Sequence, residues 1–181
     1  MVYVFLADGF EEIEALAPVD FLKRAGVETV LVGVGSQMVR GAHNITVSTD
    51  ISVDEVVLNG DLQGVILPGG MPGADNLNNS AAVHTAIDYC GENNKVVGAI
   101  CAAPFILGRK GLLKGKNATC FPGFENELEG ANVTGAGVEI DGDIVTAKGA
   151  GVAWEFGAAI CSLIVDENKS GSILEAIQWK K

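Results

Sequence analysis

Short apolar runs alternate along this chain with longer segments of helical periodicity. Val2–Ala7, Gly64–Leu67 and Val96–Ile100 contain apolar residues and glycine and no charged residue. Strands that are buried on both faces have this composition, and they occur in parallel sheets that helices cover. The alternation therefore predicts an α/β protein with a mostly parallel, doubly wound sheet and helices on both of its faces.

The same patterns predict where each element begins and ends. Short extended pieces are expected between Val39 and Thr49, and strands over Val2–Ala7, Val27–Val34, Gly64–Leu67, Val96–Ile100, Asn117–Phe121, Asn132–Thr134, Val138–Ile140 and Ile144–Ala147. Helices are expected over Glu11–Ala25, Asp54–Leu58, Ser80–Gly91, Ala102–Leu113, Val152–Val165 and Ser172–Trp179. Asp141-Gly142 indicates a hairpin turn between the last two strands.

Length and composition limit the class of protein. The 181 residues suit one domain, 1–181, with a sizeable core. No apolar run has transmembrane length and no charged leader precedes the first strand, so a cytoplasmic protein is expected. A net charge of −11 with scattered basic residues argues against binding to nucleic acids or anionic membranes. The four cysteines form no CxxC motif, which argues against a metal site and favours free thiols.

The strand Val96–Ile100 leads directly into Cys101, and a predicted helix follows. Small residues on both sides of Cys101 allow a tight turn that holds its side chain at the carboxyl end of the sheet, where such sheets bind ligands. The nearby helix N-terminus favours the thiolate, which is the reactive form. Cys101 is therefore a candidate nucleophile, although most free cysteines are simply buried apolar residues.

A helical wheel for Glu11–Ala25 singles out one acidic residue. Glu12 and Lys23 fall on the side expected to face solvent, whereas Glu14 falls opposite them on the apolar stripe. A buried carboxyl group is costly unless it is hydrogen-bonded or protonated, so Glu14 is a candidate site residue. The alternative is an acid that only complements the helix dipole, as Glu11 and Glu12 are expected to do.

Two further features could assist a reaction at Cys101. Pro68-Gly69-Gly70 follows a buried strand, and its backbone N–H groups could form an oxyanion hole, although a plain turn explains the same residues. Of the two histidines, His43 lies in a loop-like stretch and is the candidate general base. His84 is expected on the surface of a helix.

Together these residues resemble the ThiJ/PfpI superfamily, in the branch of the parkinsonism-associated protein deglycase and its bacterial relatives. The resemblance covers nearly the whole chain and rests on the order and spacing of Gly9-Phe10-Glu11-Glu12-Ile13-Glu14, Pro18-Val19-Asp20, Arg24-Ala25-Gly26, Leu67-Pro68-Gly69-Gly70, Ala99-Ile100-Cys101-Ala102-Ala103-Pro104 and Glu155-Phe156. It implies a flavodoxin-like fold, a homodimer with the first helix at its interface, and activity without a cofactor.

The resemblance also implies roles for individual residues. Cys101 matches the family's easily oxidised nucleophile, and Glu14 matches the protonated glutamate that hydrogen-bonds its sulfur. Gly69 and Gly70 match backbone N–H donors beside the sulfur, and the N–H of Ala102 joins them at the turn.

Four positions are expected at the periphery of the site: His43, Phe121, Lys148 and Asp20. His43 and Lys148 stand where relatives carry arginines, and Phe121 stands where some deglycase relatives carry a histidine. Ala102 occupies the position of the histidine that follows the cysteine in protease-like members, which argues against peptidase or amidotransferase chemistry.

The predicted function is a glyoxalase or deglycase reaction on a small 2-oxoaldehyde or its adducts, with Cys101 as a nucleophile of lowered pKa and Glu14 as proton shuttle. The alternative is an oxidative-stress sensor or chaperone-like protective protein that works through oxidation of Cys101 without significant catalysis. Cys120 could resolve the oxidised sulfur, although it is expected to fill the core, as are Cys90 and Cys161.

Overall fold

The computed structural model describes residues 1–180. Its central sheet is built from seven strands: β1 (Val2–Ala7), β2 (Thr29–Val34), β5 (Ile51–Ser52), β6 (Gly64–Leu67), β7 (Val96–Ile100), β10 (Val138–Asp141) and β11 (Ile144–Ala147). Across the sheet they follow the order β10-β11-β7-β6-β1-β2-β5. All neighbours are parallel except β10 and β11, which form an antiparallel pair. The predicted α/β fold with a mostly parallel sheet is confirmed.

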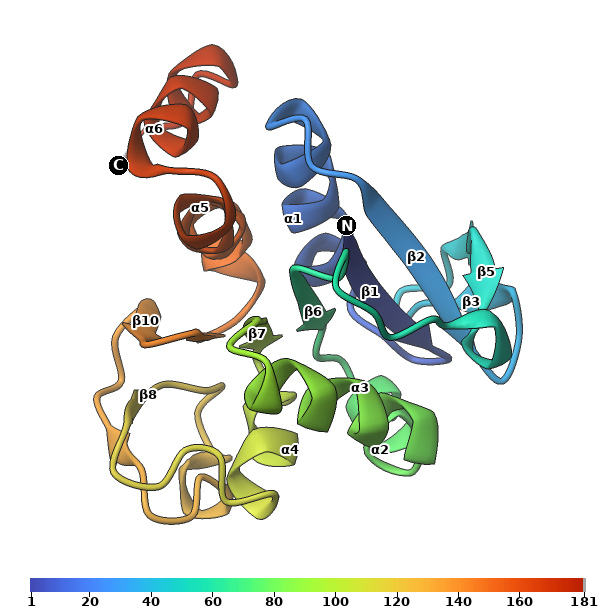
Figure 1. Ribbon diagram of the computed structural model, residues 1–181. Coiled ribbons are helices and arrows are strands. Elements are labelled where there is room, and N and C mark those ends of the chain that lie inside the picture. Colours follow the sequence, from blue (N-terminus) through green and yellow to red (C-terminus); the bar gives the residue numbers. More distant parts are fainter. Residues whose placement is uncertain (181) are drawn as a thin grey trace.

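Within residues 1–180, six helices flank the two faces of the sheet (Figure 1). On one face lie α1 (Glu12–Arg24), α5 (Ala153–Ile164) and α6 (Glu167–Ala176). On the other lie α2 (Gly73–Asn78), α3 (Ala81–Glu92) and α4 (Pro104–Arg109). Short 3₁₀ turns occur at Val53–Glu55, Glu125–Glu127 and Ala150–Val152. Two small pairs complete the fold: the hairpin of β3 (Met38–Arg40) with β4 (Thr46–Ser48), and β8 (Asn117–Ala118) beside β9 (Asn132–Val133).

The central strand β1 shows why the apolar runs are unbroken. All six of its residues are buried. Val4 and Leu6 belong to the core under α1 and α5, whereas Tyr3 and Phe5 belong to the core under α3 and α4. Because successive side chains point to opposite faces, a strand covered on both sides has no position left for a polar residue.

Some boundaries differ from those predicted. The helix expected over Ala102–Leu113 is shorter, because the chain leaves it at Lys110 and Gly111 adopts a φ of +73°. The last helix begins earlier than expected, at Glu167, because the Asp166 side chain accepts a hydrogen bond from the backbone N–H of Lys169. Aspartate is a common N-cap residue, so Asp166 in the sequence already indicated this helix start.

Two observed elements were not predicted from the sequence. The helix α2 has the composition of a turn, and it is held in place because Ala74 and Leu77 enter the core. The short strand β5 has two residues and pairs only with β2. The segment expected as a helix over Asp54–Leu58 is a single 3₁₀ turn, Val53–Glu55. Among the described residues, no helix has both the length and the apolar character needed to cross a membrane.

Candidate active site

Cys101 follows β7 at the carboxyl edge of the sheet, in a backbone conformation that few side chains adopt. Its φ is +66°. Its N–H donates to the carbonyl of Ala147 (2.8 Å), and its carbonyl accepts from the N–H of Phe121 (2.8 Å). These two hydrogen bonds, to Ala147 and from Phe121, hold the strained turn in place. The nucleophile elbows of α/β enzymes have a similar strained turn. The sulfur accepts hydrogen bonds from the N–H groups of Gly70 and Ala102.

Glu14 lies in the first turn of α1 and is 1% exposed, as its place on the apolar stripe predicted. Its Oε2 accepts the N–H of Gly69 (2.9 Å), and its carboxyl group also accepts the N–H of Ala150. A further hydrogen bond joins it to the side chain of Cys101. The structure thus brings together the two residues to which the sequence assigned the chemistry.

The two groups form a coupled pair. Burial raises the pKa of Glu14 to about 7, although hydrogen bonds with Cys101 and Gly69 oppose this shift. Burial, the charge of an ionised Glu14 and the hydrogen bond to it raise the pKa of Cys101 to about 12. The expectation of a lowered pKa for Cys101 is therefore wrong, because burial of the thiol is the largest cause of the rise. Between these two values the pair holds one proton, which rests mainly on the sulfur and must move to Glu14 before the thiolate forms.

Of the two glycines beside the pair, Gly69 donates its N–H to a different atom from the one expected. The N–H of Gly69 donates to Glu14 and not to the sulfur, so the prediction that it serves an oxyanion is corrected. Gly69 is required by space. A Cβ there would lie 2.6 Å from Cys101 Cβ and 2.6 Å from Glu14 Oε2, distances that real side chains do not adopt. Gly70 has a φ of +83°, and its N–H is available to the sulfur as predicted.

An open pocket of about 460 Å³ lies beside this pair. It is lined by Phe121, Pro122, Lys148, Val152 and residues 149–151. Two of the predicted peripheral residues, Phe121 and Lys148, are therefore neighbours in space. The Lys148 ammonium donates to the carbonyl of Gly135 (3.2 Å). Residues 149–152 were not predicted, although they follow β11 and so had to lie at the same edge of the sheet as Cys101.

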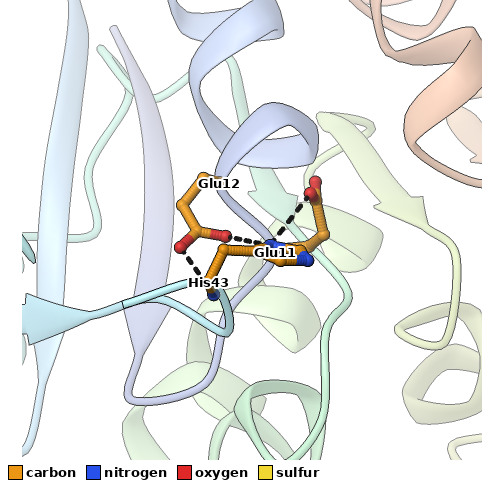
Figure 2. A group of neighbouring side chains, drawn as sticks. All are labelled: Glu11, Glu12 and His43. Carbon is orange, nitrogen blue, oxygen red and sulfur yellow. Dashed lines mark hydrogen bonds and ion pairs between the residues drawn. The ribbon is translucent and has the colours of Figure 1, made fainter. Parts of the chain in front are cut away.

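The other two peripheral candidates lie elsewhere. Asp20 forms an exposed ion pair with Arg24 (2.7 Å) on α1. The His43 Nδ1 lies 2.8 Å from Glu12 Oε2 and 3.7 Å from Glu11 Oε1, and the His43 side chain is 68% exposed (Figure 2). Its hydrogen-bond partner is thus Glu12 and not Cys101.

The helical wheel gave a wrong prediction for the exposure of Glu12. It was expected to face solvent but is 3% exposed, because the loop around residues 41–45 folds over it. Its Oε1 accepts hydrogen bonds from the N–H groups of His43 (2.8 Å) and Ile45 (3.4 Å).

Ligand atoms of Glu11, Glu12 and His43 lie within 4.8 Å of one another, the spacing of a possible metal site (Figure 2). Hydrogen bonds already satisfy both oxygens of Glu12, so the cluster is stable without an ion.

The remaining predictions on single residues concern the cysteines and His84. Cys90, Cys120 and Cys161 are buried, as expected for core residues, and Cys101 is partly exposed. His84 is half-buried, and its Nε2 lies 2.7 Å from the carbonyl of Asn78.

Known proteins resemble this chain over most of its length. A model of the DJ-1/PfpI family matches residues 1–163. The Parkinson disease protein 7 homolog of Danio rerio is 32% identical over 161 residues, which are 87% of this chain and 85% of the fish protein. A deglycase of Pyrococcus abyssi is 33% identical over 149 residues, 81% of this chain and 89% of that protein. Protein DJ-1 homolog B of Arabidopsis thaliana is 35% identical over 97% of this chain, which spans only 40% of the plant protein.

Solved structures agree with these sequence matches. Oxidized DJ-1 from Toxoplasma gondii superposes with a TM-score of 0.94 at 30% identity, and the match covers 99% of this chain and 98% of that one. DJ-1beta of Drosophila melanogaster gives a TM-score of 0.92 at 27% identity, with the same coverage. Sequence and structure together show that this chain belongs to the DJ-1/PfpI family.

Proposed function

We propose that this protein is a Cys101-dependent enzyme that converts small 2-oxoaldehydes to hydroxy acids without a cofactor. The observation that carries the proposal is the hydrogen-bonded pair of Cys101 and Glu14, in which burial raises the pKa of Glu14 to about 7. A group with such a pKa both gives and takes a proton at neutral pH. The deglycase of Pyrococcus abyssi, a relative over most of both chains, supports the same class of reaction.

The reaction begins from the state in which Glu14 carries the proton of the pair. The Cys101 thiolate attacks the aldehyde carbon and forms a C–S bond. The electron pair of the broken C=O π bond moves to oxygen, which takes the proton of Glu14. The product is a hemithioacetal, and Glu14 is now a carboxylate beside it.

Glu14 then removes the hydrogen of the former aldehyde carbon as a proton, which leaves an enediolate. Glu14 returns this proton to the neighbouring carbon, and the hydroxyl proton on the former aldehyde oxygen passes to the former ketone oxygen, which gives the thioester of a 2-hydroxy acid. Water hydrolyses the thioester, so the hydroxy acid leaves and Cys101 regains its proton. The aldehyde carbon is oxidised while the ketone carbon is reduced, so the balance needs no external oxidant. Consumption of the free aldehyde also draws its reversible adducts back toward the free amine by mass action.

The test compares wild type, Cys101→Ser and Cys90→Ala as a matched cysteine control. Each protein is incubated with methylglyoxal, and lactate is measured over time. Wild type and Cys90→Ala are expected to form lactate at similar rates, whereas Cys101→Ser forms none above the protein-free reaction. Equal lactate from wild type and Cys101→Ser would refute the proposal.

A second candidate function is oxidative sensing, favoured by the partial exposure of Cys101 while Cys90, Cys120 and Cys161 are buried. Peroxide would transfer one oxygen to the thiolate to give a sulfenate and water, and a second peroxide would give the sulfinate. Intact-mass spectrometry after graded peroxide is expected to show oxygen gain that Cys101→Ala abolishes and Glu14→Leu reduces. First oxidation at another cysteine would contradict this function.

We also propose a homodimer with α1 at its interface. Ile13 on α1 is 53% exposed, which supports an interface on this surface. Light scattering after size-exclusion chromatography is expected to give twice the 18.7 kDa of the chain, and Ile13→Glu to give the monomer mass. A monomeric wild type would contradict the dimer.

A further inference from the structure

The pocket beside the Cys101–Glu14 pair has a wall that the proposed reaction on methylglyoxal does not use. Among the large apolar side chains that are exposed in residues 1–180, Phe121 is the only aromatic one, at 47%, and it lines the pocket. Pro122, Val152 and the backbone of residues 149–151 provide most of the remaining surface. An aromatic ring in a mainly apolar depression offers a surface on which an apolar group of a ligand can be buried.

The wall is joined to the reacting groups by short contacts. The N–H of Phe121 donates to the carbonyl of Cys101 (2.8 Å). On the opposite wall, a Cβ built on Gly149 would lie 3.5 Å from the Phe121 ring and 3.9 Å from Glu14 Oε1. Ala150 donates its N–H to the Glu14 carboxyl group. The backbone of Phe121 and the 149–150 segment therefore connect the pocket directly to the two residues of the pair.

We propose that this pocket binds the substituent of the substrate and selects 2-oxoaldehydes that carry an aromatic ring over methylglyoxal. The inference rests on the proposed function and names its substrate class. The pocket of about 460 Å³ is roomy for a phenyl group, since a cavity of about 150 Å³ binds benzene. A phenyl ring gains an offset or edge-to-face contact with Phe121, whereas the methyl group of methylglyoxal leaves the ring in water.

Gly149 is part of the same argument because it leaves the space between Phe121 and Glu14 open. The Cβ of an alanine there would be in ordinary contact with the Phe121 ring, at 3.5 Å, and would occupy the path from the pair to the pocket. We expect Gly149→Ala to reduce the aromatic preference as Phe121→Ala does, by occupying the pocket instead of removing its wall.

The first arm of the test measures kcat/KM for phenylglyoxal and for methylglyoxal. The variants are Phe121→Ala and Ile140→Ala, the latter being an equally exposed control on β10 (46%). Wild type is expected to prefer phenylglyoxal by about tenfold, the value of one aromatic contact plus part of the buried ring area. Phe121→Ala is expected to lower kcat/KM for phenylglyoxal more than for methylglyoxal, so that the preference is lost, whereas Ile140→Ala retains it. A wild-type ratio near one, or a ratio that Phe121→Ala leaves unchanged, would overturn the inference.

The second arm does not depend on turnover. Cys101 is alkylated with iodoacetamide and with N-benzyl-iodoacetamide, and the ratio of the two rates is compared between wild type and Phe121→Ala. Wild type is expected to favour the benzyl reagent relative to Phe121→Ala by about fivefold. An equal ratio in both proteins would overturn the pocket assignment. A clear benzyl preference without turnover of either aldehyde would leave the pocket assignment standing and refute the proposed reaction instead.

Discussion

Glu12 and Glu14 stand two residues apart in the first turn of α1, and both are almost completely buried, at 3% and 1% exposure. Their pKa values nevertheless move in opposite directions. Burial raises the pKa of Glu14 to about 7. Burial also opposes ionisation of Glu12, but hydrogen bonds from His43 and from backbone N–H groups outweigh it and lower the pKa of Glu12.

The two pKa values differ because the two carboxyl groups have different surroundings. Glu12 meets the N–H groups of a loop and an imidazole whose pKa it raises, so its negative charge is stabilised. Glu14 is kept protonated by burial and by the nearby charge of Glu11, and its hydrogen bonds with Cys101 and Gly69 oppose this only in part. Two side chains of similarly low exposure thus become one carboxylate and one carboxyl group that keeps its proton, because Glu14 lies deeper in the protein and because the hydrogen-bond partners differ.

The largest expected effect separates the two residues by activity. Glu14→Gln cannot accept or return a proton, so kcat/KM on a 2-oxoaldehyde is expected to fall by about 100-fold or more. Glu12→Gln keeps an acceptor for the loop and is expected to lower it by less than about tenfold. Steady-state kinetics at one pH tests both variants, and similar losses would remove the functional distinction between them.

The second prediction concerns the pH dependence of stability. Between about pH 4.5 and 7 the unfolded chain ionises Glu14 while the folded protein keeps it protonated, so the free energy of unfolding falls as pH rises. The raised pKa corresponds to as much as about 3 kcal/mol. Urea unfolding at about pH 5 and pH 7.5 is expected to show this loss in wild type and a smaller one in Glu14→Gln. Parallel pH profiles for the two proteins would contradict the assignment.

The third prediction concerns Glu12 as a structural anion. Glu12→Ala leaves the partly buried N–H groups of His43 and Ile45 without their acceptor, which is expected to cost about 1 to 2 kcal/mol in the free energy of unfolding. Glu175→Ala, at an exposed position on α6, is the control and is expected to change it by less than about 0.5 kcal/mol. Equal unfolding midpoints for the two variants would show that the loop does not depend on Glu12.

The smallest effect is expected at His43, whose side chain is mostly exposed. Its raised pKa means that the ion pair with Glu12 stabilises the protein at low pH and is lost as pH rises through the folded-state pKa. His43→Asn is therefore expected to lower the melting temperature slightly at about pH 6 and not at about pH 9. A larger loss at the higher pH would reverse the sign of this linkage.

The fold was largely predictable because each apolar run indicates a buried strand without information from the rest of the chain. The bounds of β1, β6, β7 and β11 agree with those read from the sequence. Elements whose stability comes from elsewhere in the chain were missed or misjudged. The helix α2 depends on Ala74 and Leu77 entering a core formed by other segments, and no local pattern reports that.

The site divides in the same way. Cys101 was predictable because a strand followed by small residues and a helix defines a tight turn, and Glu14 because a charge on an apolar stripe is conspicuous. The burial of Glu12 was not, since its cover comes from a loop about thirty residues further on.

The sequence by itself determined which residues are candidates for the chemistry, Cys101 and Glu14, because strand burial and helical periodicity are local properties of the residue order. Only the tertiary structure decided the surroundings of these residues. It determined which N–H groups donate to each carboxyl group, including that of Gly69 to Glu14, and it placed Phe121 in a pocket beside the pair. The physical reason is that electrostatics and packing depend on distances between segments far apart in the chain, and these distances exist only after folding.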